Sequence, residues 1–317
     1  MGKGISLAFA YAGIKVCLLD SEEREADAFA ELQEQAMEEL RAELEFLASM
    51  EVISAAQVTS IGSRVKVLPY AEAGAALGEA DFVFEAVVEI PDVKNSVYQW
   101  IGECASAEAI VSSTTSTMSA NDLAAMLTSP SRFINAHWLN PAHLIPLVEV
   151  SPADVTTTEV IEKMQSLLEG IGKVTVVCKA SPGFIVSRIQ ALALNEAARI
   201  VEEGTASAED VDKAIKAGFG IRYATLGLLE FIDFGGGDIL YHATSYLGEN
   251  LDEQRFGVPD IIKENMANNR NGLRDGEGFY DWKNTDADDY RRQKLADFVR
   301  LLQHRQLMPG LEVAEDD

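Results

Sequence analysis

The chain has 317 residues, and 47% of them are hydrophobic, which is enough to bury a large core and to build two domains. Its 51 acidic residues outnumber 26 basic ones, and the resulting formal net charge of −25 argues against nucleic acid or an anionic membrane as a partner. No segment approaches the roughly 18 uninterrupted apolar residues of a membrane span.

The first residues match the second half of a dinucleotide-binding fingerprint. In that motif a strand leads into G-x-G-x-x-G, a helix and a second strand, which ends in an acid about 20 residues on. Gly2 stands for the third glycine, residues 3–13 for the helix, residues 14–19 for the second strand and Asp20 for the ribose-binding acid. The first strand and the first two glycines have no counterpart. We therefore expect the nucleotides upstream of Met1 to encode an apolar strand that ends in G-x-G-x.

A secretory signal is the alternative interpretation of this start, with Lys3 as its basic residue and residues 5–12 as its apolar core. Lys15 breaks the apolar run, which then resumes as a strand. The three scattered cysteines do not suggest a disulfide framework. These observations favour the nucleotide motif and a cytoplasmic protein. The cysteines are Cys17, Cys104 and Cys178.

A long acidic, amphipathic helix is predicted over residues 21–50, and short apolar runs then alternate with helical patterns. This alternation predicts an α/β domain with a Rossmann-like, doubly wound and mostly parallel sheet. The apolar runs cover residues 64–67, 81–86, 109–113, 133–137, 147–150 and 174–177.

The pattern changes after Ser181-Pro182-Gly183, where strand-like alternation becomes scarce. Helices are expected over residues 184–203 and 207–217 and onward to about residue 304, with a frayed acidic tail at 312–317. We therefore predict an α/β domain over residues 1–180 and an all-α domain over residues 181–317.

His137 ends one apolar run, and Glu149 lies 12 residues later inside another. If the two strands fold back around residues 140–146, their side chains become cross-strand neighbours. A carboxylate beside an imidazole fixes its tautomer and favours its charged form, which suits a general acid or base. A structural histidine is the alternative, but a buried glutamate needs a partner, which favours the catalytic pair.

Residues 111–117 place several hydroxyl groups directly after a predicted parallel strand. The carboxyl ends of such strands border the crevice where α/β sheets bind ligands, so a hydroxyl here can hydrogen-bond a substrate oxygen. A helix cap rich in serine and threonine is the alternative for any single hydroxyl.

Together and in this order, these motifs resemble the NAD-dependent 3-hydroxyacyl-CoA dehydrogenases and relatives that act on smaller free hydroxy acids. The similarity covers nearly the whole chain; each segment is weak alone, and their order and spacing are specific. The matching segments are residues 2–20, 84–89 with Lys94, 113–116, 137–141, 146–150, 181–188, 218–220, 227–233 and 276–280.

The resemblance implies that His137 is the general base for the 3-hydroxyl, that Glu149 orients it and that Ser116 binds the substrate oxygen. It also implies NAD rather than NADP, because Asp20 would repel a 2′-phosphate. A helical domain that closes over the substrate, a homodimer and a place in fatty acid metabolism are further implications, and no metal is expected. The implied cofactor-binding residues are Gly2, Asp20, Glu89 and Lys94, and the substrate-side residues are Asn140 and Ser187.

The chain departs from the family pattern on the substrate side. Thr114 and Ser187 each stand where the acyl-CoA enzymes usually have asparagine, Trp138-Leu139 replaces a double phenylalanine, and His143 follows the Asn-Pro pair. The glycines at 235–237 fit either a substrate-side loop or a tight turn between helices. The reaction type is therefore predicted more firmly than the substrate.

Three functional hypotheses remain open at this stage. The first is a 3-hydroxyacyl-CoA dehydrogenase, and the second is an NAD-dependent dehydrogenase of a small non-CoA hydroxy acid or related carbonyl compound. The third is a truncated, non-catalytic chain, because each backbone group left unpaired by a missing central strand costs about 1–3 kcal/mol when buried.

Overall fold

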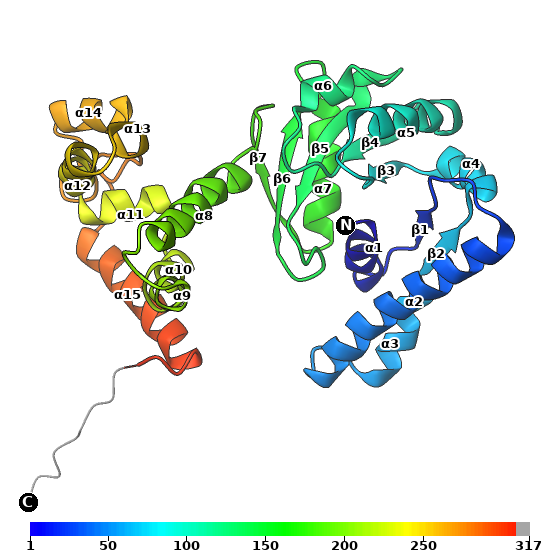
Figure 1. The fold of residues 1–317 in the computed structure, drawn as a ribbon, viewed down its shortest axis with the longest axis horizontal. Coiled ribbons are helices and arrows are strands. Elements are labelled where there is room, and N and C mark those ends of the chain that lie inside the picture. The colour runs from blue at the N-terminus through cyan, green and yellow to red at the C-terminus, as the bar shows by residue number, and fades with distance from the viewer. Residues whose placement is uncertain (309–317) are drawn as a thin grey trace, which may run out of the picture. The chain divides into compact units, whose positions relative to one another are not determined.

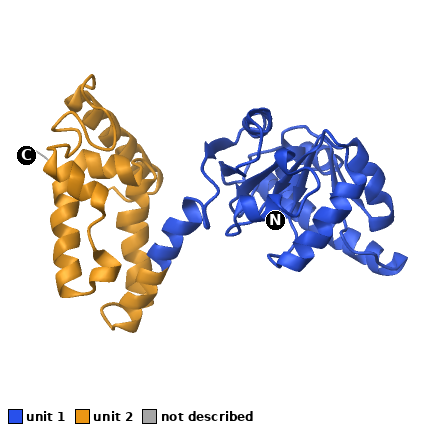
Figure 2. Ribbon diagram, turned by 90° about the horizontal axis from the view of Figure 1, so that it is seen from above, with its two compact units in different colours: residues 1–194 blue, residues 195–317 orange. Residues whose placement is uncertain are grey.

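The computed structural model describes residues 1–308 and contains two compact units, Met1–Leu194 and Asn195–Asp317 (Figure 2). Helix α8 (Val186–Glu202) contributes residues to both units, whereas the sequence places a functional boundary near residue 180. That boundary stays a prediction. The frayed tail predicted at 312–317 lies outside the described residues.

Unit 1 alternates helices with short strands, as the sequence pattern predicts (Figure 1). The long acidic helix is present and begins slightly later than predicted. In chain order the elements are α1 (Gly2–Tyr11), β1 (Val16–Leu19), α2 (Ala26–Ser49), α3 (Ala55–Gly62), β2 (Val65–Leu68), α4 (Tyr70–Glu79), β3 (Phe82–Glu85), α5 (Pro91–Cys104), β4 (Ile110–Ser113), α6 (Ala120–Ala124), η1 (Pro130–Arg132), β5 (Phe133–Trp138), β6 (Leu147–Pro152), α7 (Thr158–Gly170) and β7 (Val174–Val177).

The strands form a mostly parallel arrangement, which confirms the predicted fold class. β1 pairs with β2, and the remaining strands form one sheet in the order β3-β4-β5-β6-β7. Among the named strands of residues 1–308, only β5 and β6 pair in antiparallel fashion. Helices cover both faces, since α1 and α7 pack on one side and α5 and α6 on the other. The architecture is therefore a Rossmann-like α/β domain followed by helices.

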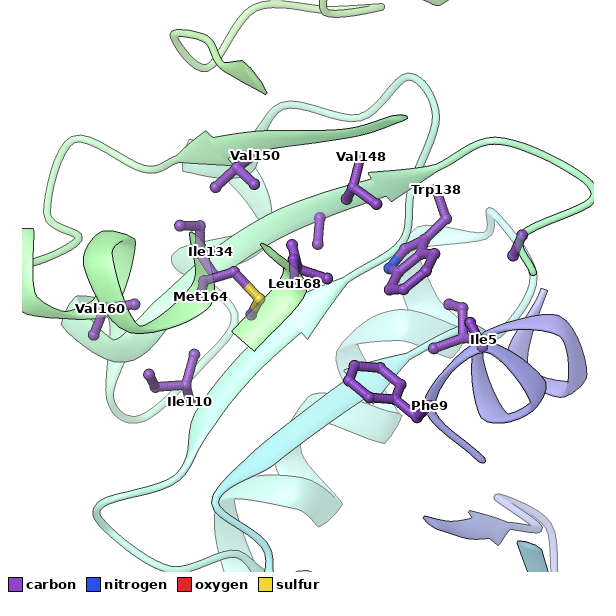
Figure 3. Close-up of a cluster of buried hydrophobic side chains, with 13 residues drawn as sticks. Ile5, Phe9, Ile110, Ile134, Trp138, Val148, Val150, Val160, Met164 and Leu168 are labelled. Atoms are coloured by element: carbon purple, nitrogen blue, oxygen red, sulfur yellow. The ribbon is translucent and has the colours of Figure 1, made fainter. Parts of the chain in front are cut away.

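Alternation along β5 determines which side chains face each layer. Ile134, Ala136 and Trp138 point into the apolar cluster beneath α1 and α7 (Figure 3), and the Trp138 ring lies 5.9 Å from that of Phe9. Successive strand residues point to opposite faces, so His137 faces the other side. The packing of Trp138 thus holds His137 at the end of its strand.

Among the described residues, β1 pairs only with β2, and β3 pairs only with β4. A cavity of 1270 Å³ separates the two groups and is lined by residues of β1, β3, α1, α4 and α5. Its walls are apolar on both faces, with Phe9 and Phe84 on one and Leu77 and Val83 on the other. The cavity therefore lies along the edges of β1 and β3.

Unit 2 is built of helices in the described residues, and none of the helices described in the chain is both long and apolar enough to cross a membrane. Asp233 is buried and accepts hydrogen bonds from the backbone of Phe279 and Tyr280 and from the Trp282 indole, which fixes a long connecting segment. The elements after α8 are α9 (Ala208–Ala214), η2 (Ile215–Phe219), α10 (Gly220–Tyr223), α11 (Leu228–Gly235), α12 (Gly237–Asn250), α13 (Glu253–Phe256), α14 (Asp260–Ala267) and α15 (Ala287–His304).

Candidate active site

The antiparallel β5–β6 pair places His137 directly opposite Glu149, as the sequence predicts. The two residues are 4% and 1% exposed, and the His137 Nδ1 lies 2.6 Å from Glu149 Oε2. A carboxylate at Nδ1 favours the tautomer that carries its proton there, which leaves Nε2 free to accept one. The pair therefore has the geometry of an oriented general base.

The other oxygen of Glu149 is held by the start of α8. Glu149 Oε1 accepts hydrogen bonds from the backbone N–H groups of Ile185 and Val186, both at 2.9 Å. Phe184 precedes them with φ +46°, and its ring lies 5.7 Å from the His137 ring. A buried carboxylate needs such donors, so the turn after Gly183 fixes the direction of the Glu149 side chain.

A cavity of 290 Å³ collects His137, Ser116, Glu89 and Thr114, with Met1 and Trp138 also in its wall. The structure thus brings together three of the side chains that the sequence predicts for the site. His137 comes from the end of β5, Ser116 from the segment after β4 and Glu89 from the segment after β3. These are neighbouring parallel strands, whose carboxyl ends meet at one edge of the sheet.

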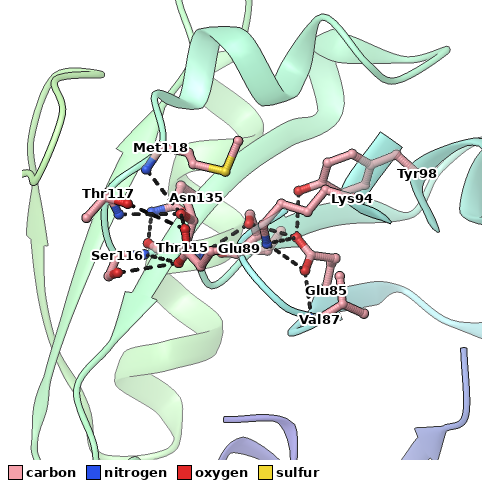
Figure 4. Close-up of polar contacts among 12 residues, drawn as sticks. Glu85, Val87, Glu89, Lys94, Tyr98, Thr115, Ser116, Thr117, Met118 and Asn135 are labelled. Atoms are coloured by element: carbon pink, nitrogen blue, oxygen red, sulfur yellow. Dashed lines mark hydrogen bonds and ion pairs between the residues drawn. The ribbon is translucent and has the colours of Figure 1, made fainter. Parts of the chain in front are cut away.

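Glu89 clamps the hydroxyl-rich segment after β4 (Figure 4). Its carboxylate accepts from the Thr115 hydroxyl at 2.6 Å and from the Ser116 backbone N–H at 2.8 Å, with the Ser116 hydroxyl at 3.4 Å. Burial raises the pKa of Glu89, but these hydrogen bonds and the charge of Lys94 outweigh burial and hold its pKa below the ordinary value. An ionised Glu89 therefore orients Ser116 at the mouth of the cavity.

Lys94 is buried, whereas the resemblance implies that it lines the cofactor cleft. Its side chain is 1% exposed, and its Nζ lies 2.8 and 2.9 Å from the two oxygens of Glu85 (Figure 4). Tyr98 and Ser113 also donate to Glu85, and burial together with Glu85 raises the pKa of Tyr98. Direct contact with a cofactor would require this buried pair to open, so a cofactor role for Lys94 stays a prediction.

Two of the four residues predicted to hold the dinucleotide, Gly2 and Asp20, line the larger cavity. A Cβ placed on Gly2 would lie 3.4 Å from Leu18 Cδ1 and 3.7 Å from Ala86 Cβ, so α1 packs closely against β1 at this glycine. Such close packing is the role of the third glycine in the fingerprint. Asp20 follows β1 and is 8% exposed, and its carboxylate accepts from Arg24 at 2.8 Å. Gly2 and Asp20 therefore fit a dinucleotide, with Arg24 beside the ribose-binding acid.

The two predicted substrate-side residues lie apart from the cavity wall described above. Asn140 is exposed just beyond β5, and Ser187 is partly buried in the first turn of α8. Asn140 follows His137 shortly after the end of β5, and Ser187 directly follows the N–H groups that hold Glu149. Their contacts with a substrate stay predictions.

Sequence reasoning missed the buried Glu85 cluster and the Arg24–Asp20 pair. Glu85 ends an apolar run, Phe82-Val83-Phe84, and this position was itself a signal, because a carboxylate inside a buried strand needs a cationic or donor partner. Arg24 lies only four residues after Asp20. Neither residue type nor spacing shows that Arg24 turns back onto that acid.

Two family models match the chain in sequence order. "3-hydroxyacyl-CoA dehydrogenase, NAD binding domain" matches residues 1–181, and "3-hydroxyacyl-CoA dehydrogenase, C-terminal domain" matches residues 183–282. The mitochondrial hydroxyacyl-coenzyme A dehydrogenase of Homo sapiens is 31% identical over 286 residues, which cover 89% of this chain and 88% of the human protein. The 5-formyl-3-hydroxy-2-methylpyridine 4-carboxylate 5-dehydrogenase of Mesorhizobium japonicum is 33% identical over 208 residues, covering 65% and 67% of the two chains.

Solved structures of dehydrogenases also match the chain. A 3-hydroxyacyl-CoA dehydrogenase from Archaeoglobus fulgidus is 30% identical with a TM-score of 0.75, and the match covers 97% of this chain and 96% of the other. A crystal structure of a 5-formyl-3-hydroxy-2-methylpyridine 4-carboxylic acid 5-dehydrogenase, described as an NAD+-dependent dismutase, is 28% identical with a TM-score of 0.69, covering 98% and 96%.

Proposed function

Because the chain belongs to the 3-hydroxyacyl-CoA dehydrogenase family of NAD-dependent oxidoreductases, we propose that it interconverts a 3-hydroxyacyl-CoA and the 3-oxoacyl-CoA. The observation that carries this proposal is the His137–Glu149 pair, whose His137 lines the same cavity as Ser116. A general base and a hydroxyl directed at the same small space suit the oxidation of a secondary alcohol.

In this proposal His137 Nε2 accepts the proton of the substrate 3-hydroxyl. Glu149 holds the Nδ1 proton and stabilises the imidazolium that forms, while the N–H groups of Ile185 and Val186 keep Glu149 in place. Ser116 positions the substrate oxygen, and Glu89 positions Ser116. The apolar packing of Trp138 limits movement at the strand end.

NAD supplies the hydride acceptor when it is bound. We assign its adenine ribose to Asp20 and the packing of α1 beneath the dinucleotide to Gly2. Arg24 is paired with both Asp20 and Glu22, so this corner keeps a net negative charge that disfavours a 2′-phosphate. The cofactor-binding residues of this proposal are Gly2, Asp20 and Glu89, and a role for Lys94 depends on whether its ion pair with Glu85 opens.

A second candidate is a dehydrogenase of a small carboxylic acid without CoA. The 33% identity to the pyridine carboxylate dehydrogenase favours it, and so do Thr114 and Ser187 at positions where the acyl-CoA enzymes usually have asparagine. The net charge of −25 points the same way, because a CoA ester is itself a polyanion.

A substrate panel separates the two candidates. We expect NADH formation at 340 nm with 3-hydroxybutyryl-CoA and a kcat/KM at least about tenfold lower with free 3-hydroxybutyrate, because the free acid lacks the remote binding groups of CoA. Turnover of a free acid without turnover of the thioester would reject the acyl-CoA proposal and support the second candidate.

We also propose a homodimer formed through unit 2. Helices α9 and α15 contain no buried residue, and unit 2 exposes several large apolar side chains. Large exposed apolar side chains favour association with another protein surface, here a second copy of the chain. These exposed side chains include Ile215, Phe219, Leu229, Ile239, Leu295 and Val299.

A further inference from the structure

Lys173 is a buried cation without a carboxylate partner among the described residues. It follows the turn at Gly172 and immediately precedes β7, and only 8% of it is exposed. Its Nζ donates to the backbone carbonyl oxygens of Ala142 at 2.7 Å and Ile145 at 2.8 Å. Burial lowers the pKa of Lys173. Burying a charge is costly without acceptors, and here two backbone carbonyl groups accept from the ammonium group.

Both carbonyls belong to the connection between β5 and β6. Within it the N–H groups of Leu144 and Ile145 bond to the Pro141 carbonyl, which makes a single tight turn. The carbonyl groups at the end of such a turn have no partner within it, and a cation near them is favourable. Lys173 thus closes this turn as a lysine can close the end of a helix.

The same turn is packed against two elements of the site. Ala142 is 1% exposed, and a Cβ on Gly4 of α1 would lie 3.2 Å from its Cβ. Lys173 Nζ also lies 5.4 Å from the centre of the Trp138 ring, within cation–π range. One ammonium group therefore links β7 to the turn and to the residue beside His137.

We propose that Lys173 is a positioning residue that holds the turn at residues 141–145, and through it the substrate-side Asn140 and the end of the His137 strand. This role rests on the proposed function of the same site. Asn140 directly precedes the turn and is itself exposed. The hydrogen bonds from Lys173 to the turn therefore restrain the backbone position of Asn140. Substrate binding should depend on Lys173 more than cofactor binding does.

The test compares Lys173→Met with Lys173→Arg and the matched control Lys163→Met, an exposed lysine of α7 paired with Glu159. In Lys173→Met we expect the KM for 3-hydroxybutyryl-CoA to rise about tenfold, as a loss of about 1.4 kcal/mol would produce. We expect kcat to change less and the Kd for NADH to stay within about twofold of wild type. Lys173→Arg should recover part of the KM, because it keeps the donors.

Hydrogen exchange of the Leu144 and Ile145 amides provides a readout that does not need turnover. We expect faster exchange at these two amides in Lys173→Met and unchanged exchange in Lys163→Met. Unchanged exchange at the turn, or an equal rise in exchange throughout unit 1, would overturn the positioning role. If wild type fails to oxidise the thioester while the turn amides still respond, the proposed function fails and the positioning of the turn stands.

Discussion

Replacing His137 with alanine should lower kcat by about 100- to 10,000-fold, which is the range that a positioned general base contributes. The His137 imidazole lines the same cavity as Ser116 and is the proposed general base. Glu149 fixes its tautomer through a 2.6 Å contact. The dinucleotide residues Gly2 and Asp20 lie on other elements, so the Kd for NADH should stay close to that of wild type. Stopped-flow absorbance at 340 nm and NADH fluorescence titration measure the two quantities.

His242→Ala serves as the matched control, because this histidine is exposed in α12 of unit 2. It should leave kcat unchanged. Glu149→Gln is informative alongside it, since the amide keeps a hydrogen bond to the ring but removes the charge. We expect that variant to fall between wild type and His137→Ala. Wild-type turnover in His137→Ala would refute the role of this residue.

Replacing Lys94 with methionine should lower the free energy of unfolding by about 3–5 kcal/mol, the cost of leaving a buried charge without its partner. The side chains of Lys94 and Glu85 are 1% and 0% exposed, and both carboxylate oxygens lie within 2.9 Å of the ammonium. Tyr98 and Ser113 continue to donate to Glu85, which moderates the loss. Urea unfolding followed by circular dichroism measures the change.

The Glu85→Gln/Lys94→Met double variant separates the ion pair from simple packing. Glutamine removes the charge that methionine leaves unpaired and still accepts from Tyr98, so the double variant should be more stable than Lys94→Met alone. A role of Lys94 in cofactor contact predicts the opposite pattern. In that case Lys94→Met would weaken NADH binding without changing the free energy of unfolding.

The fold and the His137–Glu149 pair follow from local patterns. Alternating apolar runs predict the strands, and the spacing of His137 and Glu149 around a predicted reversal gives the register that the structure confirms. Ser116 and Glu89 meet because they follow neighbouring parallel strands. Sequence periodicity predicts the strands and their order along the chain well, because the periodicity reflects which residues face the core.

Other contacts depend on side-chain direction, which periodicity does not contain. Lysine is a residue type that is usually exposed on a helix, yet the Lys94 side chain is buried and pairs with Glu85. Lys173 reaches carbonyl groups about 30 residues earlier in the chain, and no local pattern marks an acceptor that belongs to the backbone. The pairing of β1 with β2 and of β3 with β4 likewise joins strands that are distant in the chain, and no local pattern specifies it.

The most direct test of the proposed chemistry follows the hydrogen on C3 of the substrate. The purified chain is given NAD and 3-hydroxybutyryl-CoA labelled with deuterium at C3, and the reduced cofactor is analysed by mass spectrometry. Oxidation at the His137 cavity predicts that the label moves to the reduced cofactor, because the hydride leaves C3 while the hydroxyl proton passes to His137. Label released to water, or no reduced cofactor although NADH binds, would contradict this chemistry.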